Sequence, residues 1–201
     1  MPPSAVITAD IVNSTSMPPA RYKQLTGQIR QVLQGQQFEF YRGDSFQIYL
    51  RDPRIALNIV LRLRALARSY NFIHDVRAGI GIGEVPRPVR TIRTATSEAF
   101  VLSGRAFEKL SDEQRLLIES DSSIINVALS AIAGWTDYLC LGLTSKQAEV
   151  INELLQEETQ TEIARKLKKA QPTINGLAEA AGWKQFERLL ELYQESLKEI
   201  K

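Results

Sequence analysis

Residues 38–50 read FEFYRGDSFQIYL, and this stretch decides the fold of the first half of the chain. Apolar and polar residues alternate in both halves of the stretch, with the two-residue period of a half-buried strand. Between the halves stands RGDS at residues 42–45, a composition typical of a tight turn. The stretch therefore predicts a β-hairpin with Gly43 and Asp44 near its tip.

Strands and helices alternate on both sides of this hairpin. A buried strand is predicted at residues 5–9, helices at 22–33, 53–70 and 97–110, and further strands at 76–83 and 115–119. Around the hairpin the order is strand, helix, strand, strand, helix, strand, which is the split βαβ or ferredoxin-like arrangement. We therefore expect an α+β fold in which residues 1–120 form an antiparallel sheet with helices covering one face.

From about residue 122 the chain is predicted to be helical throughout. We expect a linking helix within residues 121–142, followed by an all-α domain at 143–201 with three short helices and one longer helix. The longer helix carries apolar residues at three- and four-residue steps, namely Phe186, Leu190, Tyr193, Leu197 and Ile200. This heptad pattern predicts either a contact between two subunits of a homodimer or packing within the same chain.

The composition of the 201 residues is that of an ordinary globular protein, with 44% hydrophobic residues, 24% charged residues and a net charge of +2. Cys140 is the single cysteine, which excludes an intrachain disulfide and favours a reducing compartment. We expect no secretory signal, and the apolar runs of the chain are shorter than the roughly 18–20 residues of a membrane span. We therefore expect a cytoplasmic protein. The single histidine, His74, is expected in a solvated loop.

Two aspartates fall where ends of predicted strands meet. Asp10 follows the strand at 5–9 and Asp44 sits in the hairpin turn, so both carboxylates can project from one edge of the sheet. Such a pair repels unless a cation lies between the carboxylates, and Mg²⁺ binds oxygens of carboxylates and phosphates. Residues 11–15 would form a turn whose amides and hydroxyls cradle phosphate. The alternative is that both aspartates simply suit turn and strand-end backbone.

Four short motifs in this half resemble those of class III nucleotide cyclases. They are DIVNST at 10–15, RGDSF at 42–46, RAGIGIGEV at 77–85 and AFVLSGR at 99–105. The hairpin is also similar to that of GGDEF domains, and within this superfamily the chain resembles the SatD-like group of small bacterial proteins. The resemblance implies a palm-like, ferredoxin-like fold over residues 4–120.

The resemblance also implies roles for single residues. The metal-binding aspartates map onto Asp10 and Asp44, and the transition-state arginine maps onto Arg105. The transition-state asparagine maps onto Val101 and the base-reading lysine onto Phe40, so these two functions are lost. The residues expected around the nucleotide are Ile11, Asn13, Ser14, Thr15, Gly43 and Arg77. We therefore expect a domain that binds a nucleoside triphosphate with Mg²⁺ or Mn²⁺ but turns it over poorly, with an active nucleotide cyclase as the alternative.

Residues 143–183 have the pattern of a helix-turn-helix. Thr159 predicts an N-cap, and Glu162 three residues later completes a capping box. Ala164 is the small residue that lets the next helix cross closely, and Ile174 and Leu177 would return to the core. This pattern turns the intervening side chains toward the major groove of DNA. The residues expected to contact DNA are Lys168, Lys169, Gln171, Pro172, Thr173, Asn175 and Gly176.

Two features depart from a DNA-binding helix-turn-helix. Lys168 stands where this motif has its turn glycine, and residues 144–201 carry nine basic and ten acidic side chains, a net charge of −1. A helical protein-interaction module is therefore the alternative for this part. The leading hypothesis is a bacterial transcription regulator with a degenerate cyclase-like sensory domain, and a dimeric adaptor without ligand is a further alternative. The basic loop with Arg87, Arg90 and Arg93 would reach phosphates or remain solvated.

Overall fold

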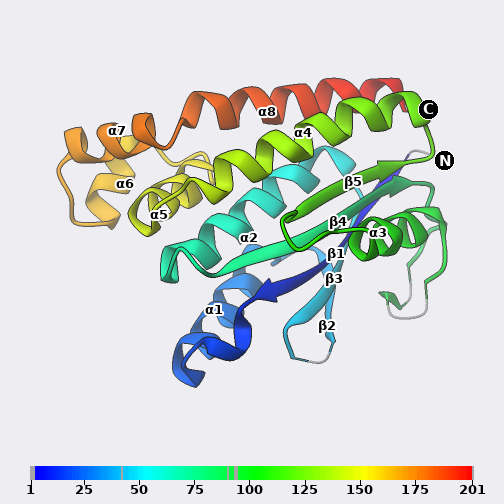
Figure 1. Cartoon of the computed structure of the whole chain (residues 1–201), viewed down its shortest axis with the longest axis horizontal. Coiled ribbons are helices and arrows are strands. Elements are labelled where there is room, and N and C mark those ends of the chain that lie inside the picture. Colours follow the sequence, from blue (N-terminus) through cyan, green and yellow to red (C-terminus); the bar gives the residue numbers. More distant parts are fainter. Residues whose placement is uncertain (1–2, 42, 90, 93–94, 201) are drawn as a thin grey trace.

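The computed structural model describes residues 3–41, 43–89, 91–92 and 95–200, and it confirms an α+β fold (Figure 1). The strands of its five-stranded mixed sheet are β1 (Ser4–Val12), β2 (Gln37–Tyr41), β3 (Ser45–Leu50), β4 (Asp75–Gly83) and β5 (Leu116–Ser120). They lie in the order β2-β3-β1-β4-β5, and all neighbours are antiparallel except β4 and β5.

Helices pack on both faces of this sheet, whereas the sequence predicted them on one face. They are α1 (Pro19–Val32), α2 (Ala56–Tyr70) and α3 (Glu98–Glu108). Odd-numbered residues of β1 such as Ile7 belong to the core shared with α1 and α2, while Val6 packs in a second cluster with Phe100 of α3. Both faces of β1 are therefore covered by helices, because alternate side chains of a strand point to opposite faces of the sheet.

Glycines of β4 explain how α3 reaches the second face. A Cβ atom at Gly79 would lie 2.6 Å from the carbonyl oxygen of Ser103, and one at Gly81 would overlap the Ala99 carbonyl and the Ser103 amide. The backbone of α3 therefore lies directly on the backbone of β4. The closely spaced glycines of the RAGIGIGEV motif are required by this contact.

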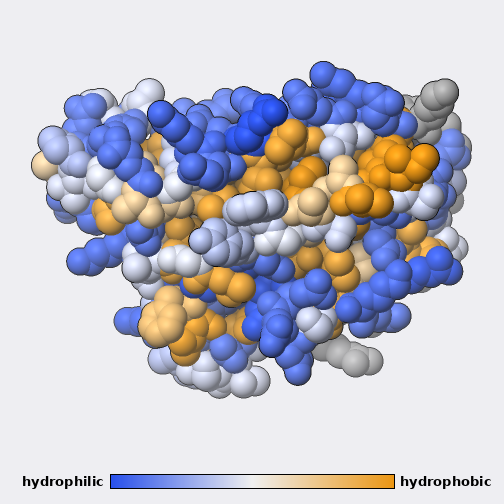
Figure 2. Space-filling view, turned by 45° about the horizontal axis from the view of Figure 1, so that its top comes forward, coloured by the Kyte–Doolittle hydropathy of each residue, from blue (hydrophilic) through white to orange (hydrophobic). Residues whose placement is uncertain are grey.

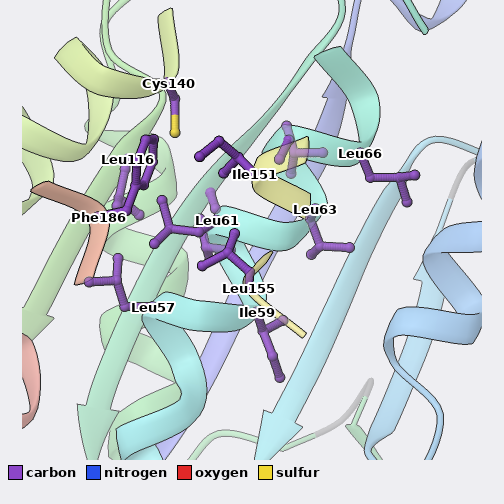
Figure 3. Packing of buried hydrophobic residues seen from close by; sticks show 14 of the residues in the cluster. Leu57, Ile59, Leu61, Leu63, Leu66, Leu116, Cys140, Ile151, Leu155 and Phe186 are labelled. Atoms are coloured by element: carbon purple, nitrogen blue, oxygen red, sulfur yellow. The ribbon is translucent and has the colours of Figure 1, made fainter. Parts of the chain in front are cut away.

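The second half of the chain packs onto the first. Its helices are α4 (Ser123–Leu141), α5 (Ser145–Leu154), α6 (Gln160–Lys166), α7 (Gln171–Ala180) and α8 (Trp183–Ser196). Helix α4 lies beside β5, α8 lies along α4, and α5 packs against α2. Ile151 and Phe186 belong to the same buried cluster as Leu57 and Leu61 of α2 (Figure 3), so the two halves share one hydrophobic core.

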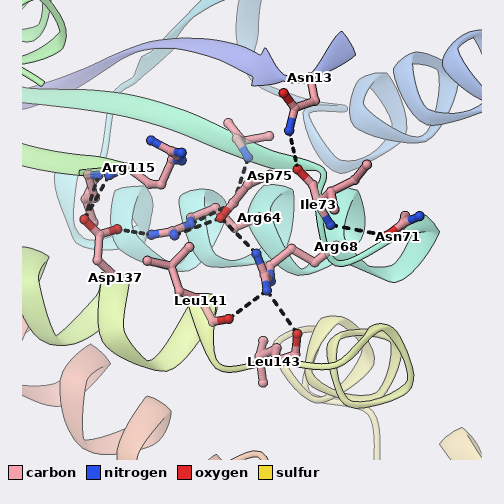
Figure 4. Close-up of polar contacts among 12 residues, drawn as sticks. Asn13, Arg64, Arg68, Asn71, Ile73, Asp75, Arg115, Asp137, Leu141 and Leu143 are labelled. Atoms are coloured by element: carbon pink, nitrogen blue, oxygen red, sulfur yellow. Dashed lines mark hydrogen bonds and ion pairs between the residues drawn. The ribbon is translucent and has the colours of Figure 1, made fainter. Parts of the chain in front are cut away.

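A buried ionic network joins α2, β4 and α4 (Figure 4). The fully buried Arg64 donates to both carboxylate oxygens of Asp75 at 3.0 Å, and it also donates to Asp137. Arg68 donates to the carbonyl oxygens of Leu141 and Leu143. Burial works to lower the pKa of Arg64, but the neighbouring carboxylates raise it above its ordinary value. The network therefore fixes α4 and the start of the C-terminal helices onto α2.

The same network decides what kind of helix α4 is. Among the described residues, α4 is the one helix long and apolar enough to cross a membrane by length and composition, with a mean hydropathy of 1.4. Its inner face packs on β5, and its one charged residue, Asp137, also accepts from the backbone amide of Arg115 at 2.9 Å. Helix α4 is therefore packed into the rest of the fold through its inner face.

Two details correct the sequence expectations. His74 is only 6% exposed rather than solvated, because the short connection between α2 and β4 turns inward through a bond from the His74 amide to the Asn71 carbonyl. The apolar side of α8 packs within the chain, which is one of the two alternatives predicted for this helix. Phe186 and Tyr193 are fully buried there, and the Tyr193 hydroxyl donates to the Pro53 carbonyl.

Candidate functional site

Asp10 and Asp44, which we call the acidic edge, lie at one edge of the sheet, as their sequence positions predict. Asp10 near the end of β1 is in register with Ser45 at the start of β3. The next amide, that of Ile11, donates to the Asp44 carbonyl at 3.3 Å. This bond extends the β1–β3 ladder into the turn and places both acids on adjacent backbone segments.

Each carboxylate of the acidic edge already has a partner. The Arg77 guanidinium on β4 donates to the two oxygens of Asp10 at 2.6 and 3.3 Å, and it lies 5.0 Å from the ring centre of Phe107. The hydrogen bond to Asp10 raises the pKa of Arg77. Asp44 accepts a hydrogen bond of 2.7 Å from the Ser14 hydroxyl.

This arrangement does not fit a metal held between two free carboxylates. Arg77 occupies both oxygens of Asp10 and supplies the positive charge beside this carboxylate. Within the described part of the chain, no group of three or more His, Cys, Asp or Glu side chains could hold a metal ion. A cation would have to displace the guanidinium of Arg77 before Asp10 could act as a ligand.

The predicted phosphate-binding turn follows β1. Ile11 is 3% exposed and contributes its side chain to the core, so of this residue only the backbone borders the edge. Asn13 adopts a left-handed backbone with φ of 57°, and its side-chain amide donates to the Ile73 carbonyl at 2.8 Å. Ser14 and Thr15 begin a short 3₁₀ turn, where Thr15 is exposed and Ser14 binds Asp44.

The hairpin turn is held from α1 by a residue that the sequence did not single out for this role. The Tyr22 hydroxyl donates to the Gly43 carbonyl at 2.7 Å. Burial and the nearby charge of Asp44 raise the pKa of Tyr22. Gly43 itself has a φ of 89°, which a residue without Cβ adopts readily. In the sequence Tyr22 stands at the start of the helix predicted over 22–33, and nothing in that pattern indicates its hydroxyl contact.

Arg105 does not join the acidic edge. Ser103 on α3 faces the sheet through a 3.0 Å hydrogen bond with Thr8, and Arg105 lies two residues, about 200°, further around the helix. The side chain of Arg105 is exposed and makes no hydrogen bond or ion pair with the described residues. Val101, one turn away, is 39% exposed. The transition-state positions implied by the cyclase resemblance therefore make no contact with the Asp10–Arg77 ion pair or with Asp44 in the described structure.

The position of the base-reading lysine is filled by an aromatic cluster. Phe40 packs on Phe46 with ring centres 4.9 Å apart, and the Arg30 guanidinium lies 4.3 Å from the Phe40 ring centre. These contacts hold β2 against β3 and α1, so Phe40 has a structural role here.

Comparison with known proteins gives no assignment. No protein family matches this chain, and no curated protein is similar to it. The function must therefore be argued from the geometry of its surfaces.

A second candidate surface lies on α6 and α7, at the end of the molecule far from the chain's C-terminus (Figure 1). The Thr159 and Glu162 capping box that begins α6 is present, as predicted. Lys168 after α6 has a left-handed backbone with φ of 53°, at the position where the motif has glycine. The amides of Lys168 and Lys169 donate to the carbonyls of Arg165 and Ala164, which closes the helix end and directs the chain into α7.

Helix α7 divides its side chains between the core and solvent as the sequence predicts. Ile174 is fully buried, and the partly buried Leu177 packs against the same core. The residues of α7 predicted to contact DNA are all exposed, namely Gln171, Pro172, Thr173, Asn175 and Gly176. Two of them, Gln171 and Asn175, lie one helical turn apart and form the polar row of α7, which no other described element covers.

A basic patch near this row is made up of Arg165, Lys166, Lys168, Lys169 and Lys184. Ion pairs neutralise part of it. Lys169 pairs with Glu149 at 3.2 Å, and Lys166 pairs with Glu153 and Glu158. The hydrogen bond to Glu153 raises the pKa of Lys166. In the described structure the remaining cations of the patch have no ion pair, and these are Arg165, Lys168 and Lys184. They are the charges available to a polyanionic partner.

The predicted basic loop lies elsewhere. Arg87 donates to the Ser4 hydroxyl at 3.3 Å, at the start of β1. Asp10 is six residues along the same strand, about 20 Å away at the rise of an extended chain. Arg87 therefore does not serve the acidic edge, and Arg90 and Arg93 lie outside the described residues.

Proposed function

We propose that this protein is a DNA-binding transcription regulator in which α7 enters the major groove and the α/β part is a degenerate cyclase-like sensory domain. The observation that carries the proposal is the exposed polar row on α7. Gln171 and Asn175 are one helical turn apart and both exposed, so they can contact neighbouring base edges. Gln and Asn side chains pair bidentately with adenine, and Thr173 can contact a phosphate or a thymine methyl group.

The turn before α7 supports the same proposal. Helices α5, α6 and α7 together have the order and short connections of a helix-turn-helix, with Ala164 buried at the crossing. Gly176 lies exposed in the middle of α7, where a Cβ would meet nothing within 4 Å. A glycine costs roughly 1 kcal/mol in a helix interior, and here it leaves room for close approach of a groove wall.

The charge of this surface limits the affinity. Three unpaired cations predict a slope of about −3 in a plot of log binding constant against log salt, which is modest for a DNA-binding protein. Asn175 is also hydrogen-bonded to Glu179 at 3.0 Å, so DNA must take the Asn175 amide from this carboxylate. The proposal therefore requires a specific sequence, because non-specific attraction is weak.

Selection of duplexes from a randomised DNA pool at low salt, followed by fluorescence anisotropy, tests the proposal. Gln171→Ala is expected to cost about 1–3 kcal/mol on the selected sequence and to relax the preference at one base pair. Lys168→Glu should weaken binding to every sequence and lower the salt slope. Lys198→Glu is the matched control, because it makes the same charge change near the opposite end of the molecule. Absence of any salt-dependent binding by the wild-type protein would reject the proposal in favour of a protein-interaction module.

Binding of a nucleoside triphosphate with Mg²⁺ or Mn²⁺ is a second candidate function, favoured by the meeting of Asp10 and Asp44 at one edge. It requires Arg77 to leave Asp10. The ferredoxin-like reading of the first half and its resemblance to SatD-like proteins support this candidate, and the strand order β2-β3-β1-β4 is compatible with them. With Val101 and Phe40 at two catalytic positions, we propose binding without efficient turnover.

Calorimetry with each nucleoside triphosphate and Mn²⁺ tests this second candidate. If Arg77 competes with the cation, Arg77→Ala should tighten Mn²⁺ binding and Asp44→Ala should abolish it. Pyrophosphate release that depends on Asp44 would instead establish an active cyclase. Absence of both metal and nucleotide binding would leave an adaptor without ligand.

A further inference from the structure

Helix α4 has an outer face that a soluble monomer would not be expected to keep. Its inner residues, such as Leu129 and Ile132, are buried against the rest of the fold. On the outer face Ile124 is 84% exposed, Val127 73% and Tyr138 70%. Exposed helix faces normally carry charged side chains, but the one charged residue of α4 points inward.

These outer residues form a continuous row, the α4 stripe, made up of Ile124, Val127, Ala131, Trp135 and Tyr138. Their spacing of three, four, four and three residues keeps them on one side of the helix. Figure 2 shows apolar surface gathered over the N-terminal half of α4, on the right of the view. The four large side chains of the stripe are 60–84% exposed, so they can form the centre of an interface, which in a standard complex buries about 800 Å² per partner.

The stripe is symmetric about Ala131. Ile124 and Tyr138 lie seven residues to either side of it, and Val127 and Trp135 lie four residues to either side. If a second copy of α4 crosses antiparallel with the two-fold axis at Ala131, each aromatic residue meets an aliphatic one. A two-fold interface requires this kind of self-complementary surface, in which residue i meets residue j and j meets i.

Small residues at the centre would let the two helices approach closely. Ala131 stands on the axis, and Gly134 lies beside it with nothing within 4 Å of a built Cβ. A hollow of about 390 Å³ is lined by Ala131, Gly134, Trp135 and Tyr138. The Trp135 and Tyr138 rings already contact edge to face at 5.7 Å, so the wall of this hollow is formed before any partner arrives. In the antiparallel pair, Val127 of the second copy stands level with Trp135 and can enter the hollow.

We propose that the α4 stripe is the homodimer interface of this protein, with a second copy of the chain as its occupant. The charges that flank α4 along the chain favour this occupant over a membrane surface. No Lys or Arg occurs between Arg115 and Lys146, whereas Glu119 and Asp121 directly precede the helix. Helices that lie on anionic membranes carry basic residues beside their apolar face. The interface is independent of DNA binding, because α7 contributes nothing to it.

Sedimentation velocity across about 1–100 µM tests the interface, because a dimer with a micromolar dissociation constant changes its population over that range. Trp135→Glu should weaken dimerisation about 100-fold or more, since it removes a central aromatic residue and adds an unpaired charge. The residue is 60% exposed, so the circular dichroism spectrum should stay unchanged. Lys23→Glu, a charge change at an exposed position of α1, should leave the dimer intact. A wild-type protein that stays monomeric throughout, or a Trp135→Glu protein that still dimerises, would overturn the proposal.

Cysteine cross-linking tests the position of the axis. The single native cysteine, Cys140, is buried, so an introduced thiol reports alone. Ala131→Cys should form an intermolecular disulfide under mild oxidation, because the Cα atoms of two copies meet on the axis within the 4.4–6.8 Å that a disulfide spans. Ile124→Cys is the matched control, since its two copies would stand about 21 Å apart along the helices. Equal cross-linking of both variants would overturn this geometry.

Vesicles provide the competing outcome. Co-sedimentation of a monomeric wild-type protein with phosphatidylcholine and phosphatidylglycerol vesicles, lost in Trp135→Glu, would assign the stripe to a membrane surface and overturn the dimer. Failure of all DNA-binding experiments would leave the dimer result untouched.

Discussion

Replacing Gly81 by alanine would place a methyl group where the backbone of α3 now lies. The new Cβ would lie 2.9 Å from the Leu102 carbonyl carbon and would overlap the Ala99 carbonyl oxygen and the Ser103 amide nitrogen. These are backbone atoms of a helix, so no rotamer change can relieve the overlap. Helix α3 must therefore move away from β4 by about 1 Å, and such a gap forfeits a quarter to a half of the dispersion energy across the contact.

The expected cost follows from the overpacking of a buried contact. Such changes destabilise proteins by about 1–3 kcal/mol, and a clash with helix backbone belongs at the upper end. We expect Gly81→Ala to lower the free energy of unfolding by about 3 kcal/mol, which in a chain of this size lowers Tm by about 6–12 °C. Equilibrium unfolding in urea measures the change directly, provided that the m value stays constant.

Gly104→Ala is the matched control on the same helix. A Cβ at Gly104 would meet nothing within 4 Å, so alanine should stabilise the protein by about 0.5–1 kcal/mol through the higher helix propensity of alanine. If the free energy of unfolding of Gly81→Ala lies within about 0.5 kcal/mol of the wild-type value, α3 does not contact the backbone of β4 directly. The reason given for the glycines of this strand would then also be wrong.

Two further predictions concern the C-terminal half. Lys168→Gly should stabilise the protein by about 0.5–1 kcal/mol, because it removes the penalty of a left-handed residue with a Cβ. Lys168→Ala should give no such gain. Thermal unfolding of these two variants separates the effect of backbone strain from the effect of losing the charge. Burial raises the pKa of the Cys140 thiol from 9.0 to about 12, so the thiol stays protonated in the folded state while it ionises in the unfolded state. The contribution of the protonated thiol to stability is complete below pH 9 and is lost as the pH rises from 9 to 12. The free energy of unfolding should therefore fall less steeply between pH 9 and 11 in Cys140→Ala than in the wild type. An equal slope in both proteins would contradict the raised pKa of Cys140.

The acidic edge shows how far sequence reasoning reaches at a site. The positions of Asp10 and Asp44 at one sheet edge followed from the order of strands. The end of one strand lies beside the start of the antiparallel strand with which it pairs. The partner of Asp10 did not follow. Arg77 faces Asp10 only because β4 pairs with β1 in a register that aligns these two residues, and nothing near residue 77 in the sequence specifies that register. A site predicted to attract a cation was thus found with an internal guanidinium.

The sequence alone determined the features that depend on local patterns. Strand alternation, helix spacing and the Thr159 capping box depend on residues a few positions apart, so they are legible without a structure. The inward and outward sides of α7 were legible for the same reason.

Tertiary structure decided every feature that depends on distant residues. The packing of α5 on α2, the burial of His74 and the use of the α8 heptad within the chain all arise from contacts between segments far apart in sequence. The exposure of the α4 stripe is of this kind, since an apolar helix is predicted equally well as core or as surface. Only the placement of its inner face on β5 and α8 leaves the row around Ala131 facing outward, because a helix packed from one side can bury only the side chains that point that way.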